Sequence, residues 1–209
     1  MKLEYPQYLN RTGYIEKIKP FIGQNLIKII SGQRRVGKSY LLFQLMDTIK
    51  KSNAKANIIY INKERYEFDN IKNYKHLINF VQRLTKAKVI NYLFIDEIQD
   101  IAEFEKALRH FMLEKNIDIY CTGSNTDMLS GELTTYLSGR YIAFKIYSLS
   151  YNEFLLFHDF QHNRESLKKY MLWGGLPFIR NINKTDKIIS EYLENIYTTI
   201  IYKDIISRH

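Results

Sequence analysis

The chain has 209 residues, of which 45% are hydrophobic and 25% charged, the balance of a soluble globular protein with one domain, or with one domain and a small appendage. Its one cysteine, Cys121, excludes an internal disulfide, and the absence of a signal peptide or a membrane-spanning apolar run predicts a cytoplasmic protein without a membrane partner. Lysine and arginine number 31 against 22 acidic residues, and the net charge of +9 leaves two interpretations open, a nucleic-acid partner or a composition rich in scattered lysines.

Strand signals alternate with helix signals along the first two thirds of the chain. A polar lead-in carries one short helix around 13–21, and further helices are expected from 38 to about 52, around 77–84 and around 104–112. The expected strands are the short apolar runs Leu26–Ile30, Asn57–Asn62, Tyr92–Ile95, Ile117–Cys121 and Ile142–Tyr147. This alternation predicts an α/β fold in which helices cover both faces of a mainly parallel five-stranded sheet.

The pattern becomes helical after Tyr147. Ser150 and Glu153 form a capping-box pattern, Gly174 stops a short helix over 165–173, and an apolar stripe predicts a long final helix over 188–201. We therefore expect two parts, an α/β core at 1–147 and a helical lid or linker region at 148–209.

The most specific motif lies between the first strand and the helix that follows it. Gly32, Gly37, Lys38 and Ser39 fit the pattern G-x-x-x-x-G-K-[ST] of the phosphate-binding loop (Walker A motif). The glycines allow backbone N–H groups to converge on an anion, and the helix that begins near Lys38 adds the positive end of its dipole. The residues expected to bind the nucleotide are Gly32, Gln33, Arg34, Arg35, Val36, Gly37, Lys38, Ser39 and Tyr40.

Side chains of this loop have distinct expected tasks. Lys38 would reach the β- and γ-phosphates, and the Ser39 hydroxyl would ligate Mg²⁺. Arg34 and Arg35 each have two open interpretations, contact with phosphate or a neighbouring acid, and exposure to solvent. The plain alternative for the whole motif is a glycine turn followed by an unrelated lysine.

Two adjacent acids follow the third strand, as in the Walker B motif of ATPases. Asp96 is expected to bind Mg²⁺ opposite Ser39, and Glu97 to orient and polarise the attacking water. The alternative is a pair of solvated acids where a strand meets a loop. Since one strand signal intervenes between the two motifs, we expect the loop strand and the acid strand to lie side by side.

Further polar candidates flank the later strands. Thr122, Ser124 and Asn125 end the fourth strand, where a side chain could contact the γ-phosphate or the water, and we favour Ser124. Arg140 is a candidate for stabilising charge on the γ-phosphoryl group, either in cis or on a neighbouring subunit's nucleotide. Because ligands bind outside the carboxyl ends of the strands in such sheets, we expect all these candidates there.

Three other features have plainer interpretations. His158 and His162 lack the further ligand that a zinc site needs. Cys121 lies in an apolar strand, and Trp173 has apolar neighbours in sequence, so both are expected to serve in packing.

Taken together, these motifs resemble a family of prokaryotic AAA+-superfamily ATPases, in which a P-loop ATPase core is followed by a nuclease-like C-terminal domain. The segments that carry the resemblance are Gly32–Ser39, Ile95–Glu97, Thr122–Ser124, Leu137–Arg140, Leu149–Phe154 and Gly174–Pro177. It implies a three-layer α/β/α P-loop NTPase fold with strand order 5-1-4-3-2 and ATP and Mg²⁺ as ligands. It also supports the roles given to Lys38, Ser39, Asp96 and Glu97, and favours Ser124 and Arg140. Similar proteins continue past the end of this chain, which is therefore expected to be a fragment or a short member.

The leading hypothesis is a Mg²⁺-dependent ATPase that uses its nucleotide state to drive a conformational change in a protein partner, a further copy of itself or a missing C-terminal domain. One alternative is a nucleic-acid-binding module with a slow ATP switch, which the net charge suggests. Another is a P-loop small-molecule kinase, which the glutamate after Asp96 disfavours.

Overall fold

The computed structural model describes residues 8–123, 137, 139–182 and 185–204, with side chains up to 199. The chain forms two compact units, Met1–Ile146 and Tyr147–His209. In the described part of the chain, no helix is both long and apolar enough to cross a membrane.

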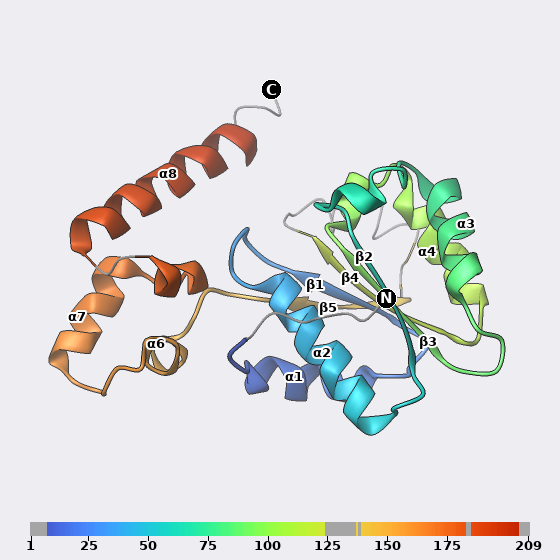
Figure 1. The fold of residues 1–209 in the computed structure, drawn as a ribbon, viewed down its shortest axis with the longest axis horizontal. Helices are drawn as coiled ribbons and strands as arrows, with labels where there is room; N and C mark the ends of the chain where they lie inside the picture. Colours follow the sequence, from blue (N-terminus) through green and yellow to red (C-terminus); the bar gives the residue numbers. More distant parts are fainter. Residues whose placement is uncertain (1–7, 124–136, 138, 183–184, 205–209) are drawn as a thin grey trace. The chain divides into compact units, whose positions relative to one another are not determined.

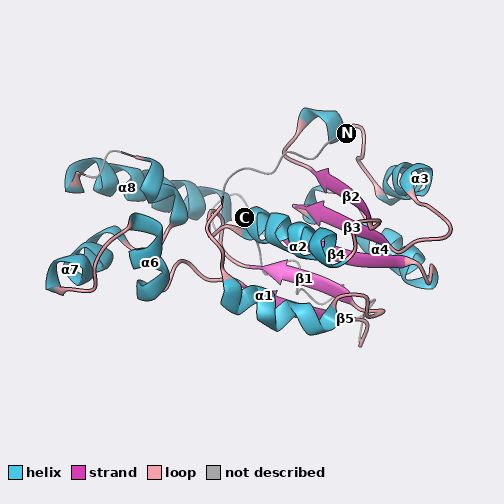
Figure 2. Ribbon diagram, turned by 60° about the horizontal axis from the view of Figure 1, so that its bottom comes forward, coloured by secondary structure: helices cyan, strands magenta, loops and turns pink. Residues whose placement is uncertain are grey.

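The first unit is built on a parallel five-stranded sheet (Figures 1 and 2). Its strands are β1 (Ile27–Ser31), β2 (Asn57–Asn62), β3 (Asn91–Asp96), β4 (Ile117–Gly123) and β5 (Tyr141–Lys145). They lie in the order β2-β3-β4-β1-β5, and every pair is parallel. The α/β fold and the order 5-1-4-3-2 implied by the resemblance are therefore confirmed.

The strand of the loop and the strand of the acids are not neighbours, so the prediction drawn from their spacing is wrong. Strand β4 lies between them, with Ile30 of β1 opposite Thr122 and Ile95 of β3 opposite Cys121. All seven residues of β4 are buried. The two strands are kept apart because β4, which is apolar and fully buried, pairs with β1 on one side and with β3 on the other. As a consequence, a residue of β4 lies between the loop and the acids.

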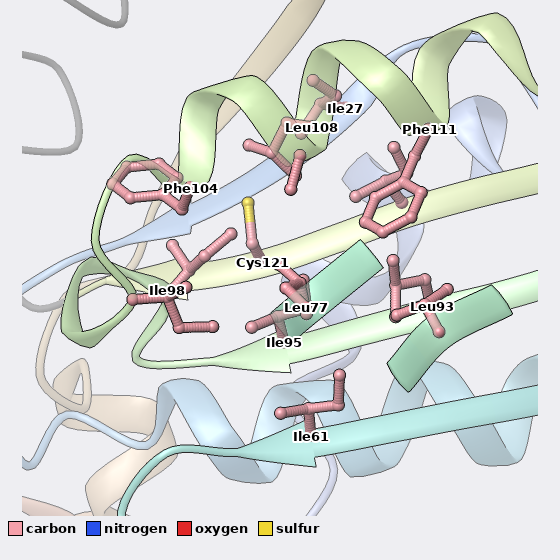
Figure 3. Close-up of a cluster of buried hydrophobic side chains, with 14 of the residues drawn as sticks. Ile27, Ile61, Leu77, Leu93, Ile95, Ile98, Phe104, Leu108, Phe111 and Cys121 are labelled. Carbon is pink, nitrogen blue, oxygen red and sulfur yellow. The ribbon is translucent and has the colours of Figure 1, made fainter. Parts of the chain in front are cut away.

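Helices cover both faces of the sheet (Figure 1). Helices α1 (Thr12–Ile18) and α2 (Lys38–Ser52) lie on one face, and α3 (Tyr74–Leu84) and α4 (Phe104–Leu113) on the other. Short 3₁₀ helices at Lys19–Phe21, Tyr66–Phe68 and Ile98–Asp100 complete the unit. Because side chains alternate along a strand, Ile61, Leu93 and Ile95 point toward the face of α3 and α4, where they belong to one apolar cluster with Leu77, Leu108 and Phe111 (Figure 3).

Cys121 belongs to this apolar cluster, which confirms its packing role. Its side chain is fully buried, and burial raises the pKa of the thiol to about 12. We expect the folded protein at pH 8 to react with a thiol reagent such as DTNB at least about 100-fold more slowly than the unfolded chain, because the reactive species is an accessible thiolate. The absorbance of the released thiolate measures this rate, and equal rates with and without denaturant would contradict the expectation.

A buried ion pair lies on the opposite face of the sheet, the face of α1 and α2. Lys28 of β1 donates to the carboxylate of Asp118 on β4 and, at 2.7 Å, to the carbonyl oxygen of Gln24. Asp118 also accepts from the Gly23 N–H at 2.8 Å and the Tyr120 hydroxyl at 2.7 Å. Burial lowers the pKa of Lys28, and the charge of Asp118 counteracts this effect. The pair thus joins β1, β4 and the turn before β1.

The second unit contains α6 (Tyr151–His158), α7 (Arg164–Trp173), a 3₁₀ helix at Pro177–Asn181 and α8 (Asp186–Asp204). The predicted capping box is present at the start of α6, and Gly174 ends α7. Trp173 is buried against Phe154, and its indole N–H donates to Asp186 at 2.7 Å, so the packing prediction is confirmed. The His158 ring stacks on Phe160.

Candidate nucleotide site

The loop between β1 and α2 requires glycine at two positions. Gly32 has a φ of +149°, and a Cβ there would lie 2.3 Å from the carbonyl oxygen of Ile146. Gly37 has a φ of +96° and caps the N-terminus of α2. A side chain is sterically excluded at the first position and strained at the second. The sequence motif therefore forms a tight turn that leads into a helix N-terminus.

Lys38 points back into this loop. Its ammonium group donates to the carbonyl oxygens of Gly32 at 3.0 Å and Gln33 at 3.2 Å, and it lies 3.7 Å from Oε1 of Glu97. Burial lowers the pKa of Lys38, whereas the charges of Glu97 and Asp96 raise it. The structure thus places the loop lysine next to the acids, although β4 separates their strands.

Asp96 is buried at the carboxyl end of β3, where three hydroxyl groups surround its carboxylate. Thr122 of β4 donates to Oδ1, and Tyr60 of β2 donates to Oδ2 at 3.2 Å. Burial raises the pKa of Asp96, and hydrogen bonds from Thr122 and from Ser39 of the loop lower it. The carboxylate therefore connects β2, β4 and the loop.

Glu97 adopts a left-handed backbone conformation, with a φ of 56°, which turns its side chain toward the loop. Its N–H donates to the Thr122 hydroxyl at 3.0 Å. The carboxylate lies between Lys38 and Gln99, whose amide nitrogen donates to Oε2. The amide oxygen of Gln99 is buried and accepts no hydrogen bond from the described residues. The left-handed backbone of Glu97 is strained for a non-glycine residue, and such strain is typical of functional sites.

Most of the remaining loop residues are exposed to solvent, and one is buried. Gln33, Arg34, Arg35 and Tyr40 are exposed. Val36 is buried, and its carbonyl oxygen accepts from the guanidinium of Arg11 at 3.2 Å.

Two further acids lie close enough to the site to respond to its charges. Burial raises the pKa of Glu64 and of Asp100, the charge of Glu97 raises both further, and the charge of Arg34 lowers both. Arg34 is exposed, and its charge reaches these two acids, so both interpretations left open for it remain predictions.

Arg140 does not lie beside the loop. Its carbonyl oxygen accepts from the N–H of Ile27, the first residue of β1, whereas the loop follows the last residue of that strand. The expectation that all polar candidates lie at the carboxyl ends of the strands is wrong for Arg140, because this residue precedes β5 in a parallel sheet. The length of β1 separates it from the loop of its own chain. Ser124 and Asn125 lie outside the described residues.

The residues present fit a Mg²⁺ ion. Mg²⁺ prefers oxygen ligands, and the Ser39 hydroxyl at the start of α2 lies close enough to the Asp96 carboxylate to lower its pKa. These two groups are the ones that would hold the ion, directly or through water.

Sequence reasoning missed Tyr60, Gln99 and Arg11. Tyr60 and Gln99 flank the two acids in space, and Arg11 supports the loop from the lead-in segment. One feature of the sequence could have pointed to Tyr60. It lies two residues before Asn62, the last residue of its strand, so both side chains lie on the same face of the sheet, the face of Asp96.

Comparison with known proteins identifies the same fold. The AAA domain family (AAA_14) matches residues 24–155. An uncharacterized protein of Haemophilus influenzae is 34% identical over 206 residues, which cover 96% of this chain and 51% of the relative. The chain spans about half the length of the curated relatives that it matches.

Two solved structures share the fold at low sequence identity. AMPPCP-bound DnaA from Aquifex aeolicus has a TM-score of 0.58 at 16% identity, over 95% of this chain and 70% of that one. Hsp104 of S. cerevisiae, in its complex with casein, has a TM-score of 0.56 at 13% identity, over 83% and 36%. Together with the loop, the paired acids and the strand order, the family match shows that this chain belongs to the AAA domain family of AAA+ P-loop ATPases.

Proposed function

We propose that the chain is a Mg²⁺-dependent ATPase that hydrolyses ATP at the loop between β1 and α2. The observation that carries this proposal is the position of Lys38, which lies inside the loop and 3.7 Å from Glu97. A cation for the phosphates and a carboxylate for the water thus lie side by side. Membership of the AAA domain family supports ATP as the nucleotide.

Each residue has a chemical task in this proposal. The N–H groups of Gly32–Ser39 bind phosphate oxygens, and Lys38 moves its hydrogen bonds from loop carbonyls to the β- and γ-phosphates. Ser39 and Asp96 hold Mg²⁺, which when bound neutralises charge on the phosphate oxygens. Glu97 orients a water for in-line attack on the γ-phosphorus and accepts its proton.

Two further residues belong to the proposal. Ser124, two residues beyond Thr122, would contact the γ-phosphate or the water. Arg140, far from the loop of its own chain, would act on the nucleotide of a neighbouring copy. The nucleotide state would then move the helical part, 148–209, and pass the change to a partner.

Replacement of Lys38 by alanine tests nucleotide binding. We expect Lys38→Ala to weaken binding of a fluorescent ATP analogue by about 30- to 150-fold, because it removes a charge-assisted contact worth about 2–3 kcal/mol. Lys51→Ala is the matched control, since Lys51 is an exposed lysine on the same helix and its loss should leave the affinity unchanged. Equal affinities of Lys38→Ala and the parent protein would refute the assigned site.

A nucleic acid is a second candidate ligand, favoured by the net charge of +9. Hydrolysis is therefore best measured with and without duplex DNA and at several protein concentrations. A DNA affinity that falls linearly with salt on logarithmic axes supports this candidate, and no binding at low salt rejects it. ADP formation without any added acceptor rejects the small-molecule kinase.

A further inference from the structure

Two hydroxyl groups fix the carboxylate of Asp96, one on each oxygen. The Thr122 hydroxyl donates to Oδ1, and the Tyr60 hydroxyl donates to Oδ2 at 3.2 Å. We call this pair of donors the Asp96 clamp. Neither donor belongs to the phosphate-binding loop or to the Asp-Glu pair. They come from β4 and β2, the strands on either side of β3.

The direction of both hydrogen bonds is set by a third group behind each hydroxyl. The Tyr60 oxygen accepts from the side-chain amide of Asn62 at 3.2 Å, so its single proton is free for Asp96. The Thr122 oxygen accepts from the Glu97 N–H at 3.0 Å, and its proton likewise points to Asp96. Both donors of the clamp are therefore oriented before any ligand arrives.

Tyr60 is held in place by packing as well as by hydrogen bonds. Its side chain is 8% exposed, and its ring lies edge-on to that of Phe43 on α2, with 5.5 Å between centroids. In the parallel register Tyr60 is opposite Phe94, and Asn62 is opposite Asp96, so these four side chains share one face of the sheet. Core packing requires the ring of Tyr60 but not its hydroxyl.

We propose that Tyr60 is a positioning residue for the divalent cation, because its hydroxyl holds the Asp96 carboxylate in the plane and rotamer that present it to the cation beside Ser39. This inference rests on the proposed function, since it takes Asp96 as the residue that holds Mg²⁺. Partners behind metal ligands orient those ligands and tune their affinity. Without the Tyr60 hydroxyl, Asp96 keeps its charge but loses one of the two bonds that fix its orientation.

Cation binding by the Tyr60→Phe variant tests this role, with the ring and its packing retained. Mn²⁺, followed by electron paramagnetic resonance in the presence of a non-hydrolysable ATP analogue, serves as the probe. We expect Tyr60→Phe to weaken Mn²⁺ binding by about 10-fold, while affinity for the nucleotide in EDTA stays within about twofold of the parent. Tyr66→Phe is the control, since Tyr66 is 90% exposed, and it should match the parent in both measurements.

A second variant tests the direction of the hydrogen bond. Asn62→Ala removes the donor behind Tyr60, and we expect weaker Mn²⁺ binding that is not additive with Tyr60→Phe, because the two groups act in series. Equal Mn²⁺ affinities of Tyr60→Phe and the parent overturn the inference and leave the proposed function standing. If the parent itself binds no Mn²⁺ with the nucleotide, the metal assignment fails and the inference fails with it.

Discussion

Replacing Glu97 by glutamine is expected to lower ATP turnover by about 10²- to 10⁴-fold, the usual contribution of a positioned general base. The amide has nearly the same size as the carboxylate, but it cannot accept a proton from water. The substitution leaves the phosphate-binding loop and Lys38 unaltered, and Lys38 still has its position inside the loop through Gly32 and Gln33, so nucleotide binding should be retained. Phosphate release under single-turnover conditions measures the chemical step, and a fluorescent ATP analogue measures binding.

Glu64 provides a sharp comparison for this experiment. It is another acid near the site, and burial and the charges of Glu97 and Asp96 all raise its pKa. We expect Glu64→Gln to keep turnover within a few-fold of the parent protein, since Glu64 lacks the hydrogen bond and the ion pair that hold Glu97 beside the loop. If Glu97→Gln hydrolyses ATP at the parental rate while Glu64→Gln does not, the general base has been assigned to the wrong residue.

The second large effect concerns stability. Lys28→Met is expected to lower the free energy of unfolding by about 3–5 kcal/mol, because it leaves the buried carboxylate of Asp118 without its counter-ion. Both side chains of the pair are almost fully buried, at 0% and 3% exposed. Methionine fills the same space, so the loss reports the uncompensated charge rather than a cavity. Chemical denaturation followed by circular dichroism measures it.

An exposed pair serves as the control for this stability effect. Lys19 lies 3.8 Å from Glu16, and both side chains are more than half exposed, so Lys19→Met should cost less than about 1 kcal/mol. The double variant Lys28→Met with Asp118→Leu is expected to recover much of the lost stability, since apolar replacement of a whole buried pair is often neutral. If Lys28→Met were no more harmful than Lys19→Met, the pair would not be a stabilising feature of this fold.

The parts of the site that could be predicted from sequence are those encoded locally. Gly32, Gly37, Lys38 and Ser39 carry their geometry in a short motif, because a tight turn and a helix N-terminus arise within eight residues. The paired acids follow an apolar strand for the same reason. The strands and helices were found to within a few residues, since their apolar periodicities are strong.

The parts that could not be predicted depend on which strands are neighbours. Lys28 interrupts an apolar run, and its partner Asp118 comes 90 residues later, so the pair becomes visible only when β1 and β4 are known to be adjacent. The same holds for the Asp96 clamp, whose donors come from the strands on either side of β3. The spacing of the motifs suggested that β1 and β3 were adjacent, and only the family resemblance supplied the correct order. The sequence-based prediction for Arg140 was wrong because this residue precedes its strand. In a parallel sheet, residues before the strands lie at the amino ends and residues after them at the carboxyl ends.

Gly32, at the start of the loop, packs closely against the backbone of Ile146, the last residue of the first unit. Ile146 also donates its N–H to the carbonyl oxygen of Ser31 at 2.7 Å, and the next residue, Tyr147, begins the second unit. Even one methyl group at position 32 must displace the backbone at 146. The backbone that excludes a side chain at position 32 is therefore the same backbone that continues directly into the helical segment.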